Sequence, residues 1–225
     1  MIEAKDVVKT FRGGALAHRR AVEAVRGVSL ALEEGRTYAL VGESGSGKTT
    51  LTHLLTGLLA PDSGSVTLDG RAIAASPARE RVRAVQLVLQ DGKSALDPRV
   101  HVGPEDAFHR KPAELSGGEQ KRVCIARALS VQPRCIIFDE TTAGLDVVRR
   151  RQALDLVRSL QRERRFAALF VTHDLVVARY MADTLWVMKD GAIVDTLERP
   201  FSSQSIHHPY TALLMSEADL GITAP

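Results

Sequence analysis

The eight residues from Gly42 to Thr49, Gly-Glu-Ser-Gly-Ser-Gly-Lys-Thr, constrain the fold more than any other segment of the sequence. An apolar run at 37–41 precedes them and has the length of a buried strand. Leucines then recur at the spacing of one helix face, at Leu51, Leu54, Leu55 and Leu58. A glycine-rich turn between a buried strand and a helix is typical of α/β proteins with an open parallel sheet. The segment therefore predicts a strand, a binding loop and a helix, in that order.

The same octapeptide fits the phosphate-binding pattern G-x-x-x-x-G-K-[ST], the P-loop. Glycines let backbone N–H groups surround phosphate oxygens, and the start of the following helix adds its positive dipole. Lys48 supplies a charge to the β- and γ-phosphates, and the Thr49 hydroxyl is a ligand for Mg²⁺. The loop predicts a nucleoside triphosphate site. Its candidate residues are Gly42, Glu43, Ser44, Gly45, Ser46, Gly47, Lys48, Thr49 and Thr50.

A second apolar run, Cys135 to Phe138, leads directly into Asp139 and Glu140. Buried parallel strands deliver their last residues to the crevice where ligands bind. Asp139 is then placed to hold the shell of Mg²⁺, and Glu140 can orient or deprotonate an attacking water. The alternative, an acidic start to the next helix, loses weight beside a phosphate-binding loop.

A third motif opens a predicted helix with Leu115, Ser116, Gly117, Gly118 and Glu119. A serine, flexible glycines and an acidic first turn form an ordinary helix N-cap, and this reading stands for the motif alone. The same groups also form a second phosphate-binding surface. A chain that already has one such loop has no evident use for another, unless it serves a neighbour's nucleotide.

Elsewhere short apolar runs alternate with helical patterns, which predicts parallel pairing with crossovers. Strands are predicted at 25–32, 65–68, 84–89, 135–138, 167–171, 185–188 and 192–196, after a turn at 61–64 and with hairpin turns at 69–70 and 190–191. Helices are predicted at 119–130, 147–164 and 175–182. The residues between Thr10 and Ala21 are predicted as an exposed loop, and those after Pro200 as a tail with few periodic signals.

Composition excludes several classes of protein. A chain of 225 residues suggests one large domain or one domain with a subdomain. The net charge is only +3, and no aromatic residues interleave with the basic clusters, so no nucleic-acid partner is expected. Apolar runs of about five residues are too short for the ~20 that cross a bilayer, and Glu3 and Asp6 do not fit a secretory signal. A cytoplasmic location is expected, with Cys124 and Cys135 as buried thiols.

The order of the motifs resembles the ATP-binding subunit of ABC transporters. That order is the P-loop, Gln90 at a strand end, Leu-Ser-Gly-Gly-Glu, the acidic strand, Ala-Gly-Leu-Asp at 143–146 and Thr-His-Asp at 172–174. The resemblance covers nearly the whole chain. It implies a P-loop NTPase core of mostly parallel sheet with flanking helices, an N-terminal antiparallel β subdomain and a helical subdomain. We therefore expect an ABC ATPase domain at 1–200, with the helical subdomain within about 91–130, and a C-terminal tail at 201–225.

The resemblance also implies a role for single residues. Phe11 would stack on adenine, and Gln90 would contact Mg²⁺ and the transporter interface. Glu140 would be the catalytic base, and His173 would contact the γ-phosphate. Asp146 would cross the interface of a head-to-tail dimer. In that dimer, two ATP molecules lie between the P-loop of one subunit and residues 115–119 of the other.

Two further segments resemble the peptide/nickel importer group: residues 90–99 and His208-Pro209-Tyr210-Thr211. The alternative for the second segment is a plain amphipathic end. The implied protein hydrolyses ATP as a homodimer or with a paralogous ATPase subunit, on the inner face of the cell membrane. Permease subunits bind it directly, and a solute-binding protein acts indirectly. The alternatives are an ABC-type ATPase that binds ATP without coupled transport, and a non-transport ABC ATPase.

The sequence departs from the family pattern in three ways. Only residues 91–114 separate Gln90 from Leu115, so the helical subdomain is expected to be shortened, either naturally or because residues are missing. Its three prolines, among them Pro104 and Pro112, and its histidines, His101 and His109, suit a long helix poorly. Thr141 replaces the usual proline, and Glu119 the usual glutamine, with little expected effect.

Overall fold

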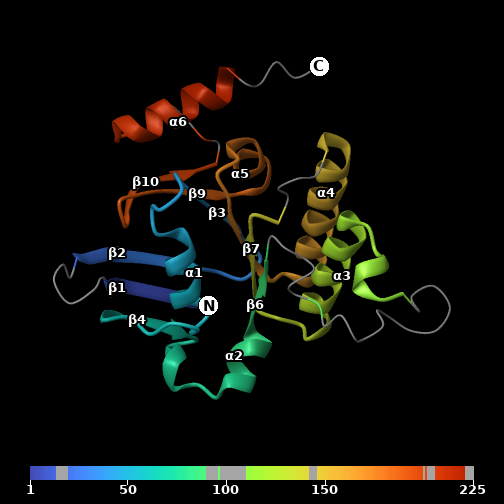
Figure 1. Ribbon diagram of the computed structural model, residues 1–225, viewed down its shortest axis with the longest axis horizontal. Coiled ribbons are helices and arrows are strands. Elements are labelled where there is room, and N and C mark those ends of the chain that lie inside the picture. The colour runs from blue at the N-terminus through green and yellow to red at the C-terminus, as the bar shows by residue number, and fades with distance from the viewer. Residues whose placement is uncertain are drawn as a thin grey trace.

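The computed structural model contains two β-sheets that pack against each other (Figure 1). The structure describes residues 1–13, 20–89, 96, 110–141, 146–199, 201 and 206–220. Side chains of both sheets share one apolar core, in which Val7 and Val25 pack with Leu40 and Trp186. The mixed α/β architecture expected from the sequence is confirmed.

The larger sheet has six strands in the order β10-β9-β3-β8-β7-β6. All neighbours pair in parallel except the hairpin of β9 and β10. Every residue of β3 and β8 is buried, as expected of parallel strands covered on both faces. In this order the strands are β10 (Ala192–Glu198), β9 (Thr184–Lys189), β3 (Thr37–Val41), β8 (Ala167–Val171), β7 (Cys135–Asp139) and β6 (Val85–Val88). Each was predicted, within two residues at either end.

The smaller sheet is antiparallel, in the order β2 (Arg20–Leu32), β1 (Ile2–Gly13), β4 (Ser63–Leu68) and β5 (Arg71–Ala72). The predicted loop between Thr10 and Ala21 is wrong at both ends. β1 continues to Gly13, which faces Arg20 of β2, because cross-strand pairing satisfies backbone groups that the sequence pattern alone leaves open. Residues 14–19 lie outside the described part of the chain. The predicted turn at 61–64 is also too long, since β4 begins at Ser63.

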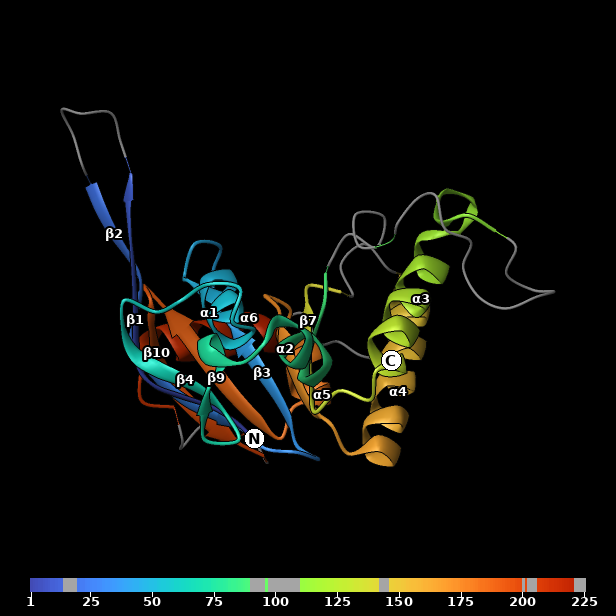
Figure 2. The ribbon, with the colours of Figure 1, turned by 90° about the horizontal axis from the view of Figure 1, so that it is seen from below.

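Helices cover both faces of the six-stranded sheet. α1 (Lys48–Leu55) shares the core between the two sheets, while α3 (Gly117–Ser130), α4 (Val147–Arg164) and α5 (Leu175–Met181) pack on the opposite face. The last helix, α6 (Pro209–Leu220), packs on this second core through Tyr210. Figure 2 shows α3 and α4 side by side, away from α1 and the antiparallel sheet. The predicted helices at 119–130, 147–164 and 175–182 are thus present, within two residues at either end.

Three features of the helices were not predicted. α1 ends at Leu55 and Gly57 follows with φ 69°, so Leu58 is not on the helix face and is 69% exposed. A short helix, α2 (Ala78–Ala84), precedes β6. The expected tail contains α6, whose entry is fixed by the buried carboxylate of Asp195. No helix in the described ranges has the length and apolar character needed to cross a membrane.

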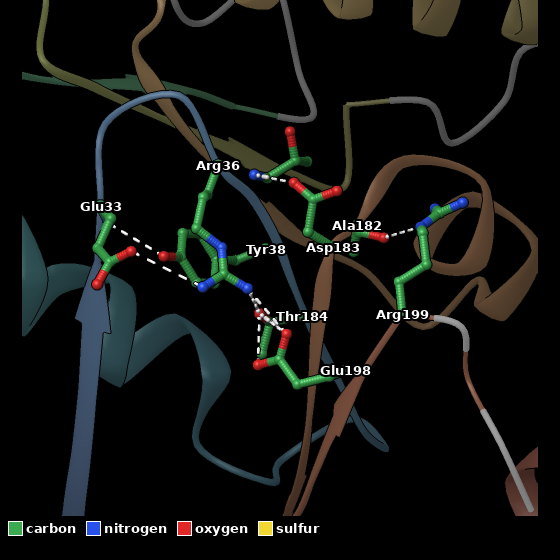
Figure 3. Close-up of polar contacts among 9 residues, drawn as sticks. Glu33, Arg36, Tyr38, Ala182, Asp183, Thr184, Glu198 and Arg199 are labelled. Atoms are coloured by element: carbon green, nitrogen blue, oxygen red, sulfur yellow. Dashed lines mark hydrogen bonds and ion pairs between the residues drawn. The ribbon is translucent and has the colours of Figure 1, made fainter.

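A polar cluster at the end of the sheet opposite the P-loop joins β3, β9 and β10 (Figure 3). The guanidinium of Arg36 donates to Glu198 Oε2 at 2.8 Å and to Thr184 Oγ1 at 3.0 Å. The Asp183 carboxylate accepts from the Thr37 N–H at 2.9 Å. Because these contacts set the register of β3 and β9 at one end, they also set where the two strands finish at the other.

Candidate functional site

Three of the motifs predicted from the sequence meet at one edge of the six-stranded sheet. β8 lies between β3 and β7, and Val171 at its end pairs with Leu40 of β3 and Asp139 of β7. The P-loop follows β3, Glu140 follows β7, and His173 follows β8. Parallel strands therefore bring three segments that are far apart in the sequence to one crevice.

A cavity of about 500 Å³ opens at this edge. Its walls come from the P-loop and α1, from the end of β7 and from two apolar residues that no motif contains. The lining residues are Ala24, Ser44, Gly45, Gly47, Lys48, Thr49, Thr50, Leu89, Asp139 and Glu140. The predicted site residues in this wall belong to the P-loop segment or the acidic pair, so the two motifs form one site with Ala24 and Leu89 added.

Lys48 is buried against the loop that it follows. Its Nζ donates to the carbonyl oxygens of Gly42 at 2.8 Å and Glu43 at 2.7 Å. Burial lowers the pKa of Lys48, and the nearby carboxylates of Glu140 and Asp139 oppose that shift. A cation held on neutral carbonyls in a partly desolvated cavity attracts anions strongly, because little water screens its charge.

Neighbouring backbone determines the shape of the P-loop. A Cβ on Gly47, which has φ 107°, would stand 2.2 Å from the Ala24 carbonyl oxygen, and one on Gly42 would stand 2.1 Å from that of Met188. The Gly191 N–H in the β9–β10 turn donates to the Ser46 carbonyl at 3.0 Å. Only glycine fits at the two positions where β2 and β9 approach the loop. These contacts and the hydrogen bond from Gly191 stabilise the conformation of the loop.

The acidic pair and the histidine lie together. Glu140 has a left-handed backbone, φ 46°, and its Oε1 lies 3.1 Å from His173 Nδ1. Strained non-glycine backbone is enriched at functional sites. Burial and the Glu140 carboxylate raise the pKa of Asp139, while His53 and Lys48 lower it. The hydroxyl of Thr49 and the carboxylate of Asp139 in one cavity form an oxygen donor set that suits Mg²⁺, which keeps most of its other positions for phosphate and water.

Among the predicted residues that the structure describes, Phe11, His173 and the P-loop residues Gly42, Glu43 and Ser46 do not line this cavity. Phe11 lies on β1 opposite Val22 with 45% of its surface exposed, and Ala24 of β2 lines the cavity instead. Gln90 lies outside the described part of the chain, next to Leu89, which does line the cavity.

The segment 115–119 forms its own helix cap. Ser116 is the N-cap of α3, where its Oγ donates to Glu119 Oε2 at 2.7 Å and accepts from the Glu119 N–H at 3.4 Å. The Ser116 hydroxyl and N–H lower the pKa of Glu119 by bonding its carboxylate. None of these five residues lines the described cavity, and Figure 2 shows α3 well away from α1. Asp146 caps α4 by accepting from the Arg149 N–H at 2.9 Å, while 142–145 lie outside the described residues.

Sequence reasoning missed three residues at the site. Ala24 and Leu89 carry no chemical signal, and only the pairing of strands places them in the cavity wall. The Tyr210 hydroxyl accepts a hydrogen bond from the Glu43 N–H of the P-loop at 2.9 Å. The sequence analysis singled out the segment His208-Pro209-Tyr210-Thr211 for its resemblance to the importer group. That resemblance did not predict the contact between Tyr210 and the P-loop.

The family model described as ABC transporter matches residues 25–105 and 102–143. The oligopeptide transport ATP-binding protein OppF of Streptococcus pyogenes is 32% identical over 96% of this chain and 81% of its own length. The nickel import ATP-binding protein NikE of Rhodospirillum rubrum is 36% identical over 95% and 90%. The metal-staphylopine import system ATP-binding protein CntF of Staphylococcus aureus is 35% identical over 88% and 91%.

Solved structures agree with this family. A dimeric post-hydrolysis state of the ATP-binding cassette MJ0796, bound to ADP and Pi, superimposes with a TM-score of 0.74 at 26% identity, over 88% of this chain and 98% of that one. The cbiO1 protein of Clostridium perfringens has the same fold, with a TM-score of 0.76 at 22% identity over 98% and 92%. The chain therefore belongs to the ABC transporter family, as an ATP-binding cassette with ATPase activity.

Proposed function

We propose that this chain is the ATP-hydrolysing subunit that drives import of peptides, nickel or metal chelates. The observation that carries the proposal is the meeting of Lys48, the Asp139–Glu140 pair and His173 at one sheet edge, with Glu140 Oε1 3.1 Å from His173 Nδ1. The class of solute rests on relatives named for import of oligopeptides, nickel and metal-staphylopine. Those names favour an importer subunit over an ATPase without coupled transport.

In the proposed mechanism the P-loop binds the triphosphate of ATP. Its backbone N–H groups and the start of α1 surround the phosphate oxygens, and Lys48 moves from the Gly42 and Glu43 carbonyls to the phosphates. Thr49 and Asp139 would hold Mg²⁺, which neutralises charge on the phosphates when bound. The buried setting of Asp139 supports this role, because a carboxylate with a raised pKa gains from a cation beside it.

Glu140 acts as the general base in this proposal, and His173 contacts the γ-phosphate. Glu140 follows β7 and His173 follows the neighbouring strand β8, and their side chains are in contact. This proximity supports a shared role at the γ-phosphate. Gln90 would contact Mg²⁺ from the neighbouring strand end, and Phe11 would stack on adenine. The half-exposed ring of Phe11 supports a stacking role, since it has room for a partner.

A second copy, or a paralogous subunit, would complete the site. Residues 115–119 and Asp146 are proposed to reach the nucleotide of the partner. The exposure of Ser116 and Gly117 at the start of α3 and of Asp146 at the start of α4, and the dimeric form of the similar cassette MJ0796, support this arrangement. Permease subunits are the proposed membrane partners, with a solute-binding protein acting through them, which would place the chain on the inner face of the membrane.

The shortened helical subdomain is part of the proposal, as is the division into an ATPase domain at 1–200 and a tail at 201–225. The two matches to the family model meet at 102–105, inside the short segment. The alignment with OppF runs over 252 positions, more than the 225 residues of this chain, so the relative has residues that this chain lacks. We propose that these residues are absent from the segment 91–114, which would leave a permease a smaller surface on which to dock.

A coupled assay tests the function. The purified chain should release phosphate from ATP in the presence of Mg²⁺, and a strain that lacks the chain should take up less labelled nickel, peptide or metal chelate. Complementation with the Lys48→Ala variant should restore no uptake. Phosphate release without any change in uptake of the three solutes would support an ATPase that is not an importer subunit of this class.

A further inference from the structure

The first turn of α6 touches the P-loop, although the two lie 167 residues apart in the chain. The Tyr210 hydroxyl accepts a hydrogen bond of 2.9 Å from the backbone N–H of Glu43. Tyr210 is only 5% exposed, so water competes little for this contact. Burial raises the pKa of Tyr210, and the hydroxyl therefore stays protonated at neutral pH.

The contact fixes a peptide group that also holds Lys48. The N–H of Glu43 and the carbonyl of Gly42 belong to one planar peptide unit. Tyr210 bonds the N–H side of this plane, and Lys48 Nζ bonds the carbonyl side at 2.8 Å. Rotation of the plane would break both bonds at once. Tyr210 thus controls the direction in which the Gly42 carbonyl points, and with it the resting position of the Lys48 ammonium.

Several contacts hold Tyr210 itself in place. The buried Asp195 carboxylate accepts from the N–H groups of His207 at 3.2 Å and His208 at 2.9 Å, directly before α6. Lys189 Nζ lies 4.7 Å from the centroid of the Tyr210 ring, within cation–π range. Both Asp195 and Lys189 belong to the β9–β10 hairpin. Gly191 of the same hairpin donates to the Ser46 carbonyl, so the hairpin and α6 support the P-loop together.

We propose that Tyr210 is a positioning residue of the ATP site, which fixes the Gly42–Glu43 peptide and so presents the P-loop and Lys48 to the nucleotide phosphates. The proposal rests on the function proposed above, because it needs ATP at the P-loop. The segment His208-Pro209-Tyr210-Thr211 then has a definite role, since it starts a helix at a place from which a tyrosine reaches the loop. The orientation of the Gly42–Glu43 peptide stabilises bound ATP and the transition state to the same extent. Tyr210 should therefore affect nucleotide affinity and leave the rate of the chemical step unchanged.

The test replaces one hydroxyl. Tyr210→Phe keeps the ring in its apolar setting and removes the acceptor of the Glu43 N–H. The expected result is a roughly two- to tenfold weaker affinity for both ATP and ADP, because a partly buried donor loses its partner. The KM for ATP should rise by the same factor while kcat stays unchanged. In addition, hydrogen exchange of the Glu43 amide, followed by NMR, should become faster than in the wild type.

Tyr180→Phe is the matched control, since it removes a hydroxyl that bonds Asp155 on α4 instead. Its nucleotide affinity and Glu43 exchange should equal those of the wild type. If the wild type binds ATP and Tyr210→Phe binds it equally well with unchanged exchange, the positioning role is wrong and the proposed function stands. If the wild type binds no ATP, the proposed function itself fails. A fall in kcat with unchanged KM would also overturn the positioning role.

Asp195→Asn gives an independent test that leaves Tyr210 in place. It removes the charge that anchors the entry to α6, so it should also weaken ATP binding. If both residues act through the Glu43 contact, the double variant should bind ATP no more weakly than the weaker single variant. Losses in affinity that multiply in the double variant would contradict a shared path through Tyr210.

Discussion

The chain has two glycine-rich segments, the P-loop and residues 115–119. They differ in whether neighbouring atoms of the same chain leave room for a side chain at the glycine. A Cβ on Gly47 would collide with the Ala24 carbonyl at 2.2 Å, so the fold of the chain itself requires glycine there. A Cβ on Gly117 would meet no atom within 4 Å in the described structure. The packing of the described residues therefore does not require glycine at 117, which agrees with the proposed contact between this residue and a partner's nucleotide.

The hydrogen bonds repeat this contrast. The P-loop receives donors or acceptors from α6, from the β9–β10 turn and from Lys48. The hydroxyl of Ser116 and the carboxylate of Glu119 instead bond within their own turn, each to the other residue. The P-loop is thus preorganised by its own chain, whereas the start of α3 is a self-capped, exposed surface. The comparison predicts different behaviour when each region is altered.

Glu140→Gln carries the largest expected effect and separates chemistry from binding. Glutamine keeps the shape and much of the hydrogen bonding but cannot accept a proton from water. Phosphate release should therefore fall by about 10²–10⁴-fold, the usual contribution of a positioned general base. ATP should still bind through Lys48 and Thr49, and a dimer closed around it should persist longer than in the wild type. Size-exclusion chromatography with Mg²⁺-ATP beside a phosphate-release assay measures both.

The outcomes of this experiment discriminate clearly. Hydrolysis at the wild-type rate would show that Glu140 is not the base. A variant that loses rate but never dimerises, even at high concentration, would place the fault in assembly and direct attention to the short segment at 91–114.

Gly117→Asp tests the exposed member of the comparison. The open space around Gly117 accommodates a side chain, so melting temperature and ATP affinity of the monomer should match the wild type. A carboxylate facing a partner's nucleotide costs several kcal/mol, so dimerisation with ATP and turnover should fall by at least about tenfold. The matched variant Gly47→Ala should instead lose ATP binding in the monomer. Equal ATPase rates in Gly117→Asp and the wild type would remove the basis for a shared site.

Lys48→Ala tests the preorganised member. It removes the side-chain cation that lies in the cavity among the P-loop backbone. Hydrogen bonds to charged groups contribute roughly 1.5–3 kcal/mol each, which corresponds to a loss of about 10- to 100-fold in ATP affinity. Lys5→Ala, which removes an exposed cation paired with Glu3, is the control. Isothermal titration with unchanged affinity for Lys48→Ala would mean that the phosphates lie elsewhere.

Sequence alone predicted the elements whose residues are buried on both faces. β3, β8 and the P-loop were found because continuous apolar runs and the glycine spacing leave few alternatives. β1 was not delimited, since its alternation is interrupted by register shifts between Ala4 and Val7 and again between Val7 and Lys9. Its pairing with both β2 and β4, rather than its own pattern, defines it as a strand.

The sequence predicted the residues that carry the chemistry of the candidate site. It did not predict the apolar residues of the cavity wall or the helix that supports the P-loop. Asp139, Glu140 and His173 follow predicted parallel strands, so their meeting could be expected. Ala24 and Leu89 are apolar residues whose place in the wall depends on tertiary pairing. α6 was missed because its stability depends on contacts with the β9–β10 hairpin, above all the buried Asp195, that no local pattern reveals.

Asp139→Asn has the smallest expected effect, and its sign follows from the raised pKa of Asp139. Burial and the adjacent Glu140 disfavour the ionised carboxylate in the folded chain, so it lowers the free energy of unfolding wherever it is ionised, at neutral pH included. Asparagine removes that charge and should raise the Tm without nucleotide or Mg²⁺ by a few degrees, on the order of the 2–4 °C that 1 kcal/mol produces in a chain of this length. The advantage should shrink as the pH is lowered and the wild-type carboxyl becomes protonated. Mg²⁺-dependent hydrolysis should fall in the same variant, since a ligand for the ion is lost. Calorimetry in EDTA at several pH values measures the first effect, and a lower Tm for Asp139→Asn at neutral pH would show that the carboxylate stabilises the site even without its cation.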